Sequence, residues 1–214
     1  MLRFFLILAL FAPLYADGSK FKPGLTVVLD LNGTIAVASE TISAMKTEVR
    51  SAMKQTGIAV DFKLREELDP DSSFEDLIVV QLKGRCEMDN SPILLDERGP
   101  SALAFTHSSE GEILPFSSVL CDRLRTSIRT VMGGEDFKRG NFLLGRAIGR
   151  VLSHEFFHIL GNTSGHGKDG IAKRSLTAGQ LISEQLRFEK ADANLLRMRM
   201  RTAPPGPAIH TDLP

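Results

Sequence analysis

The chain has 214 residues, a length that suits one domain of ordinary size with a substantial core. Lysine and arginine together number 26, as do aspartate and glutamate, so the formal net charge is zero. This balance excludes a chain that is drawn to nucleic acid or to membrane surfaces by bulk charge.

Residues 1–16 have the pattern of a secretory signal peptide. Arg3 supplies the positive end, residues 4–11 form the apolar run, and cleavage is expected after Ala16. The run is too short to anchor the chain stably in a bilayer. Leu14 is larger than the residue usual three before a cut, so an uncleaved tether is the alternative. The pattern predicts a secreted or periplasmic protein without a stable membrane span after cleavage.

The next part of the chain predicts strands around one helix. Residues 25–31 are aliphatic and β-branched, which predicts a strand. Asn32-Gly33 is a turn signal after which residues 34–38 could pair back as a hairpin, but they are interpreted as a loop. Apolar side chains at helical spacing predict a helix over residues 39–56. The alternating pattern of residues 58–64 predicts a half-buried strand, and residues 65–73 a surface loop.

The middle of the chain predicts three more strands, over residues 77–82, 102–106 and 113–120. The polar stretch 83–100 predicts a long loop. A helix over residues 122–131 and a glycine-containing connection over 132–140 lead to the longest apolar helix.

Cys86 and Cys121 each lie at or just past the end of a predicted strand. Export places them in an oxidising compartment, where a disulfide could tie two neighbouring strands together. Two buried free thiols are the alternative. Neither cysteine belongs to a C-x-x-C pair, so a cysteine-based zinc site is not supported.

Residues 141–166 contain an H-E-x-x-H motif at positions 154–158. His154 and His158 lie one turn apart on one helix face, so their imidazoles can reach the same metal ion. Glu155 can stand beside the metal and take a proton from water.

The helix around this motif is apolar on nearly all sides, apart from a polar stripe formed by Arg146, Arg150 and Ser153, which predicts a buried central element. The alternative interpretation is that the histidines bond to the backbone while Glu155 pairs with Arg150 or Arg146. Two histidines and a carboxylate on one buried turn are costly without a metal, which favours the metal site.

A third ligand is expected downstream of the motif. His166 follows a short break and is the first candidate, Glu184 on the last predicted helix is its rival, and Asp169 and His107 are further candidates. A surface loop histidine is the alternative interpretation of His166.

The C-terminal part predicts one helix and a tail. Thr177 and Gln180 have the spacing of a capping box and predict a last helix that continues to about residue 196. Residues 202–214 are proline-rich and predict disorder, which makes His210 a solvated tail residue. The chain thus divides into a signal peptide (1–16), one domain (17–201) and a disordered tail (202–214).

With this motif on a buried helix, a later histidine after a glycine and this order of elements, the sequence resembles the zincin metallopeptidases, most closely the metzincin-type branch with its small secreted bacterial members. The resemblance spans roughly residues 25–196, and its specific part is residues 154–166. It implies a zincin-like α+β fold, in which a twisted mixed sheet of four to five strands packs on the central motif helix with further helices.

Two features depart from that branch. Gly161 falls where the helix is expected to stop, but the usual spacing would put the third histidine at Ser164, two residues before His166. Gly165 and Gly167 could let the longer loop fold back. No methionine lies in residues 170–172, although metzincins place one beneath the zinc after the third ligand.

The resemblance implies a secreted zinc-dependent peptidase. Zn²⁺ would be held by His154, His158 and His166, and Glu155 would act as general base on the zinc-activated water. An extended peptide or protein substrate would lie antiparallel to an edge strand, for which residues 102–106 are the candidate.

A non-catalytic secreted zinc-containing module that only binds peptides is the alternative. The missing methionine turn and the lack of tyrosine after position 15 favour it, whereas the intact Glu155 favours catalysis. A zinc hydrolase acting on a non-peptide amide is a third interpretation.

Overall fold

A mixed five-stranded sheet lies at the centre of the computed structural model, which describes residues 24–69, 71–89, 101–202 and 209–210. The strands run in the order β2 (Ala59–Leu64), β1 (Gly24–Val37), β4 (Leu77–Cys86), β6 (Glu112–Leu120) and β5 (Ala104–Ser109). The first four strands run parallel to one another, whereas β5 is antiparallel to β6 and forms one edge. The predicted α+β class with a mixed sheet is confirmed.

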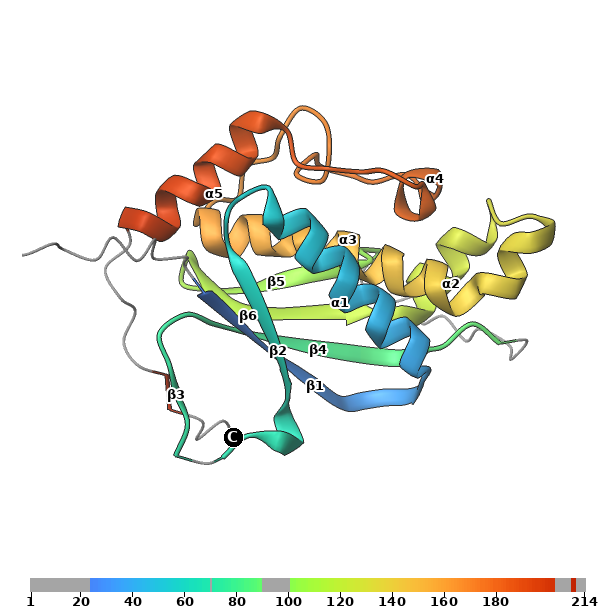
Figure 1. Cartoon of the computed structure of the whole chain (residues 1–214), viewed down its shortest axis with the longest axis horizontal. Helices are drawn as coiled ribbons and strands as arrows, with labels where there is room; N and C mark the ends of the chain where they lie inside the picture. The colour runs from blue at the N-terminus through green and yellow to red at the C-terminus, as the bar shows by residue number, and fades with distance from the viewer. Residues whose placement is uncertain (1–23, 70, 90–100, 203–208, 211–214) are drawn as a thin grey trace, which may run out of the picture.

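The helices gather on one side of this sheet (Figure 1). They are α1 (Ser39–Lys54), α2 (Cys121–Arg129), α3 (Gly140–Gly161), α4 (Ala178–Ile182) and α5 (Lys190–Thr202), with short 3₁₀ turns at Arg65–Glu67 and Gly134–Arg139. The motif helix α3 packs against α1 and against β5 and β6, so it has the central position predicted for it.

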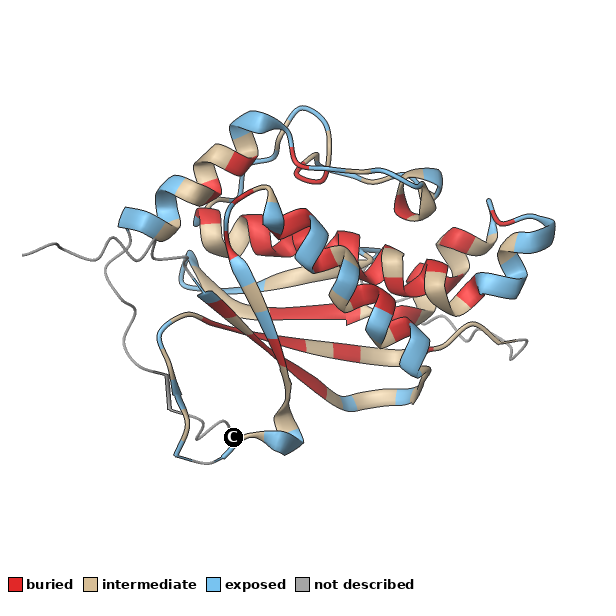
Figure 2. Cartoon of the chain, in the orientation of Figure 1, coloured by how far each residue is buried: buried red, intermediate tan, exposed pale blue. Residues whose placement is uncertain are grey.

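The main core lies between the sheet and α3. Figure 2 shows buried residues along the strands and on the helix surfaces that face them. Fully buried aliphatic and aromatic side chains come from β1, β4 and α3, among them Val27, Val80, Leu144, Leu152 and Phe156. Because α3 is buried on most of its circumference, its register in the fold is fixed, and so is the position of the motif at its end.

Glycine allows α1 and α3 to approach closely. A Cβ atom at Gly145 would lie 2.3 Å from the backbone oxygen of Thr41 and 2.7 Å from Ala44 Cβ. A Cβ at Gly149 would lie 2.9 Å from the backbone oxygen of Met45. The backbone of one helix thus occupies the space that a side chain on the other would need.

Replacing Gly145 by alanine should therefore lower the free energy of unfolding, by about 2 kcal/mol, because overpacking forces the two helices apart. Gly179 in α4 is a matched control, since a Cβ atom there would meet nothing within 4 Å. Gly179→Ala should raise stability by a few tenths to about 1 kcal/mol through helix propensity. Urea unfolding followed by circular dichroism measures both, and equal effects of the two substitutions would contradict this account.

The interpretation of residues 34–38 as a loop is wrong, because β1 continues to Val37 and pairs with β4 as far as Cys86. Asn32-Gly33 forms a β-bulge within β1 and not a turn, since the register with β4 shifts between Asp30 and Gly33. Asp30 Oδ1 accepts the backbone N–H of Asn32 there at 2.9 Å. The predicted loop over 83–100 correspondingly begins only after Cys86, and residues 90–100 lie outside the described residues.

The last predicted helix is interrupted. It begins at Ala178 with the predicted capping box, ends at Ile182, and resumes as α5 only at Lys190. Arg146 Nη1 donates 2.9 Å hydrogen bonds to the carbonyls of Ile182 and Ser183. Those carbonyls would otherwise accept bonds from the next helical turn, so the arginine binds the end of α4 and the chain leaves the helix.

The predicted disulfide is present. Cys86 at the end of β4 and Cys121 at the start of α2 are bonded, with their Cα atoms 5.0 Å apart. Because α2 follows β6, the bridge ties β4 to its parallel neighbour, and the alternative of two free thiols is wrong.

Both ends of the chain lie largely beyond what the structure describes. In the predicted tail, Ile209–His210 form β7, which pairs antiparallel with β3 (Ser73–Phe74), and the signal peptide falls outside the described residues. None of the helices in the described ranges is both long and apolar enough to cross a membrane.

Candidate metal centre

The C-terminal end of α3 orients the second motif histidine. The helix ends at Gly161, and Asn162 takes the left-handed conformation (φ 41°) that reverses the chain. Thr163 donates its backbone N–H to the carbonyl of His158 at 3.1 Å, and its own carbonyl lies 2.7 Å from His158 Nδ1. The helix end therefore fixes the ring of His158 through the residue that follows the turn.

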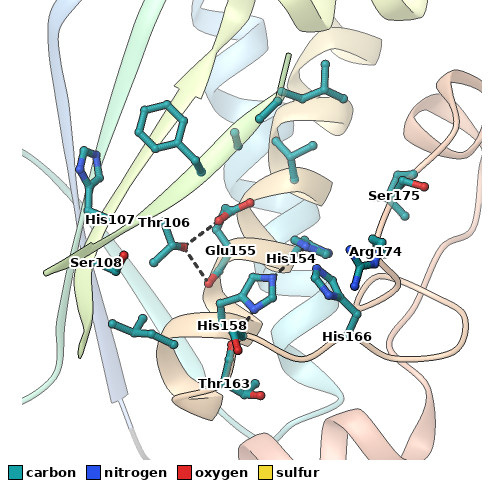
Figure 3. Close-up of a pocket in the computed structure, with 18 of the residues that line it drawn as sticks. Thr106, His107, Ser108, His154, Glu155, His158, Thr163, His166, Arg174 and Ser175 are labelled. Atoms are coloured by element: carbon teal, nitrogen blue, oxygen red, sulfur yellow. Dashed lines mark hydrogen bonds between the residues drawn. The ribbon is translucent and has the colours of Figure 1, made fainter. Parts of the chain in front are cut away.

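Three histidines face one point in Figure 3. The Nε2 atoms of His154 and His158 lie 3.1 Å apart, and one ring nitrogen from each of His154, His158 and His166 lies within 4.8 Å of the others. Two nitrogen ligands of a tetrahedral zinc ion would be about 3.3 to 3.4 Å apart, given Zn–N bonds of about 2.0 to 2.1 Å. The spacing suits a single metal ion.

Hydrogen bonding fixes which nitrogens face that point. Nδ1 of His154 lies 2.8 Å from the carbonyl of Ile171, just as Nδ1 of His158 faces Thr163. A carbonyl only accepts, so each Nδ1 carries the proton of its neutral ring, and both Nε2 atoms turn lone pairs toward each other. Such lone pairs at 3.1 Å repel each other unless a cation lies between them.

A proton is disfavoured as the cation between these two Nε2 atoms. Burial lowers the pKa of His154, although its hydrogen bond to Ile171 acts in the opposite direction. Burial is also the first cause that lowers the pKa of His166, followed by the charges of His158 and His154. Neutral imidazoles are the form that binds metals, so the lowered pKa values of His154 and His166 suit a site for a divalent metal ion.

Glu155 lies beside the histidines and is held by the edge strand. Its side chain is buried, and Oε2 accepts a 2.7 Å hydrogen bond from the hydroxyl of Thr106 on β5 (Figure 3). Burial raises the pKa of Glu155, whereas the bond from Thr106 and the charge of His158 act in the opposite direction. A carboxylate with a raised pKa is a better proton acceptor near neutral pH.

The polar stripe of α3 faces another part of the molecule. Arg150 is fully buried and its Nε donates to Glu48 on α1 at 2.8 Å, while Nε of Arg146 lies 3.9 Å from the same carboxylate. The interpretation in which Glu155 pairs with Arg146 or Arg150 is therefore wrong.

Of the candidates for the third ligand, only His166 joins the motif histidines. Among the residues that the structure describes, His154, His158 and His166 are the only group of three or more potential ligands. Glu184 and Asp169 lie outside that group. His107 lines the same cleft, but its Nε2 lies 3.1 Å from Ser118 Oγ.

The loop that carries His166 folds back at residues other than those predicted. Neither Gly165 nor Gly167 has a positive φ, and the left-handed positions are Asn162 and Gly170 (φ 71°). Gly167 instead provides space, because a Cβ atom there would lie 2.4 Å from Asp192 Oδ2.

The segment without the expected methionine still supports the site. Ile171 and Ala172 are fully buried, and the carbonyl of Ile171 faces the ring of His154. The backbone N–H of Ile171 donates to the carbonyl of Arg187 at 3.0 Å, and that of Gly167 to Ala172 at 2.8 Å. Backbone hydrogen bonds thus join the loop that carries His166 to the segment whose carbonyl orients His154.

A cleft of about 630 Å³ opens onto Glu155 and the three histidines. Figure 3 shows Thr106, His107 and Ser108 of β5 on one side of them, and Arg174 and Ser175 on the other. Residues 102–106 line this cleft, and the strand predicted there lies at the sheet edge as expected, but its bounds were wrong, because β5 begins at Ala104 and continues to Ser109. Its register with β6 shifts between Thr106 and Ser108, at the level of Glu155.

Sequence reasoning missed the groups that orient the site. Thr106 lies in a predicted strand, but the sequence does not say which face of that strand meets α3. The carbonyls of Thr163 and Ile171 give no signal at all, because every residue has one. The one usable constraint was strand geometry, since successive side chains of a strand point to opposite faces and only alternate positions can reach the helix.

No protein-family model, curated protein or solved structure matches this chain. The case for a function therefore depends on the chemistry of the cleft itself.

Proposed function

We propose that the chain is a zinc-dependent peptidase resembling the zincins, with His154, His158 and His166 holding the cation and Glu155 acting as general base. The observation that carries the proposal is the pair of Nε2 atoms 3.1 Å apart, both turned toward one point by backbone carbonyls. Imidazole nitrogens suit zinc, and three protein ligands leave the fourth tetrahedral position open, as in catalytic zinc sites. Export through residues 1–16 completes the proposal, and the Cys86–Cys121 disulfide supports it.

The chain's own groups have defined roles in this reaction. When bound, the cation would polarise the scissile carbonyl and make a water molecule acidic near neutral pH. The carboxylate of Glu155 would take a proton from the attacking water and return it to the nitrogen of the leaving amine. Thr106 restricts that carboxylate to one orientation through its 2.7 Å hydrogen bond, so less rotamer freedom is lost on reaching the transition state.

The edge strand would bind the substrate backbone. An extended peptide can add to a sheet edge through main-chain hydrogen bonds, and β5 is such an edge beside the three histidines. A peptide lying along β5 would have its carbonyls within the same cleft as Glu155. The proposed substrates are therefore extended segments of peptides or proteins.

Metal removal tests this function directly. The purified chain should contain about one zinc ion per molecule by elemental analysis, and should cleave members of a mixed fluorogenic peptide library. A chelator such as 1,10-phenanthroline should abolish cleavage, and added zinc should restore it, whereas magnesium should not, because magnesium prefers oxygen ligands. Full zinc occupancy with no cleavage of any peptide would indicate a non-catalytic peptide-binding module, and a chain that binds no metal would refute the site.

A further inference from the structure

Arg174 carries a positive charge on the wall of the cleft. Its side chain has no hydrogen-bond or ion-pair partner among the described residues. Its side chain is exposed, and Figure 3 places it beside His166, across the cleft from Thr106. The arginines of α3 differ in this respect, since Arg146 and Arg150 both contact Glu48. The charge of Arg174 is therefore available to a molecule that enters the cleft.

The cleft offers little negative charge of its own. Glu155 is the only carboxylate among the described lining residues, and it is already bonded to Thr106. Arg174 is the only lysine or arginine among them.

A bound divalent cation would strengthen this imbalance. Three neutral imidazoles do not cancel the charge of such an ion, whereas a carboxylate ligand would cancel part of it. With Arg174 on the wall, the open side of the site would carry excess positive charge. A cleft of one sign with low-dielectric walls concentrates ligands of the opposite sign.

We propose that Arg174 selects peptides that carry a carboxylate next to the residue bound at the metal centre. This inference rests on the proposed peptidase function and adds the substrate class to it. The planar guanidinium can bind both oxygens of a carboxylate at once, which a lysine cannot match. The carboxylate can come from an aspartate or glutamate side chain or from a free C-terminus.

Binding to a catalytically silent chain tests this selection without requiring turnover. The zinc-loaded Glu155→Gln chain is titrated with fluorescein-labelled ten-residue peptides that have blocked ends and one glutamate, scanned along the sequence. Each is paired with a peptide that has glutamine at that position, and a second set leaves the C-terminus free. The same titrations are run with Arg174→Ala and Arg174→Lys added. Arg199→Ala on α5 is the matched control, because Arg199 is exposed and lies outside the cleft.

We expect glutamate at the best position to bind on the order of 10-fold more tightly than glutamine, with a smaller ratio at high salt. Arg174→Ala should remove this preference without changing glutamine-peptide binding, Arg174→Lys should keep part of it, and Arg199→Ala should keep all of it. A response to the free C-terminus alone would assign the carboxylate to the chain end and would still support the proposal.

Two results would overturn it. One is a glutamate preference that survives Arg174→Ala, which would place the carboxylate on the zinc or elsewhere. The other is equal binding of the glutamate and glutamine peptides, at every position, to the chain that retains Arg174. A preference that depends on Arg174, combined with no hydrolysis by the chain that retains Glu155, would support the carboxylate site and refute the peptidase function. The two hypotheses therefore fail in different experiments.

Discussion

Replacing Glu155 by glutamine is expected to abolish peptide hydrolysis while the zinc stays bound. The amide cannot accept the proton that the mechanism assigns to the carboxylate, and loss of general base catalysis costs about 10²- to 10⁴-fold in rate. The amide oxygen can still accept the hydrogen bond from Thr106, so the side chain should keep its place beside the histidines. Values of kcat/KM on a fluorogenic peptide and the zinc content of the same sample measure the two effects.

Stability and a second glutamate provide the controls. Because burial disfavours the charged form of Glu155, a neutral amide at this position should leave the free energy of unfolding unchanged or slightly higher. Glu184→Gln should change neither rate nor zinc content, since Glu184 lies outside the histidine cluster. Retention of full activity by Glu155→Gln would remove Glu155 from the mechanism, and loss of zinc would show that its carboxylate helps to hold the ion.

The fold followed from the sequence wherever one face of an element is apolar. The alternation of residues 58–64 and the helical spacing of residues 39–56 identified β2 and α1, because burial of one face determines both patterns. Errors arose where tertiary contacts overrode local signals. The Asn32-Gly33 pair became a bulge in β1 because pairing with β4 continued beyond it, and Arg146 ended α4 from a distance in sequence of 36 residues.

The candidate site was likewise predictable from the sequence only in part. The spacing of His154 and His158 guarantees that both project from one face of any helix, so their proximity required no knowledge of the fold. The choice between His166 and Glu184 did require it, because each lies on a separate segment whose return path is set by backbone geometry. That path depends on a left-handed Asn162, a position for which glycine would have been expected.

Removal of any one of the three histidines is expected to cost most of the bound zinc. A site with two imidazoles retains too few bonds to compete with water and buffer. Affinity should fall by more than about 100-fold, since even changes in the groups that merely orient metal ligands cost about 10- to 100-fold. His154→Ala, His158→Ala and His166→Ala would be compared by competition with a coloured zinc chelator. His107→Ala is the matched control, because His107 lines the same cleft but does not belong to the cluster.

The three substitutions should differ in what else they disturb. His166 is exposed, so His166→Ala should lose zinc with little change in the stability of the metal-free chain. His154 and His158 also bond to Ile171 and Thr163, so their removal frees two buried or turn-forming carbonyls and should lower metal-free stability by about 1 kcal/mol each. If His166→Ala instead kept its zinc, the third ligand would have to come from elsewhere. A carboxylate in that place would lower the charge of the site by one, which would weaken the case for carboxylate selection by Arg174 as well.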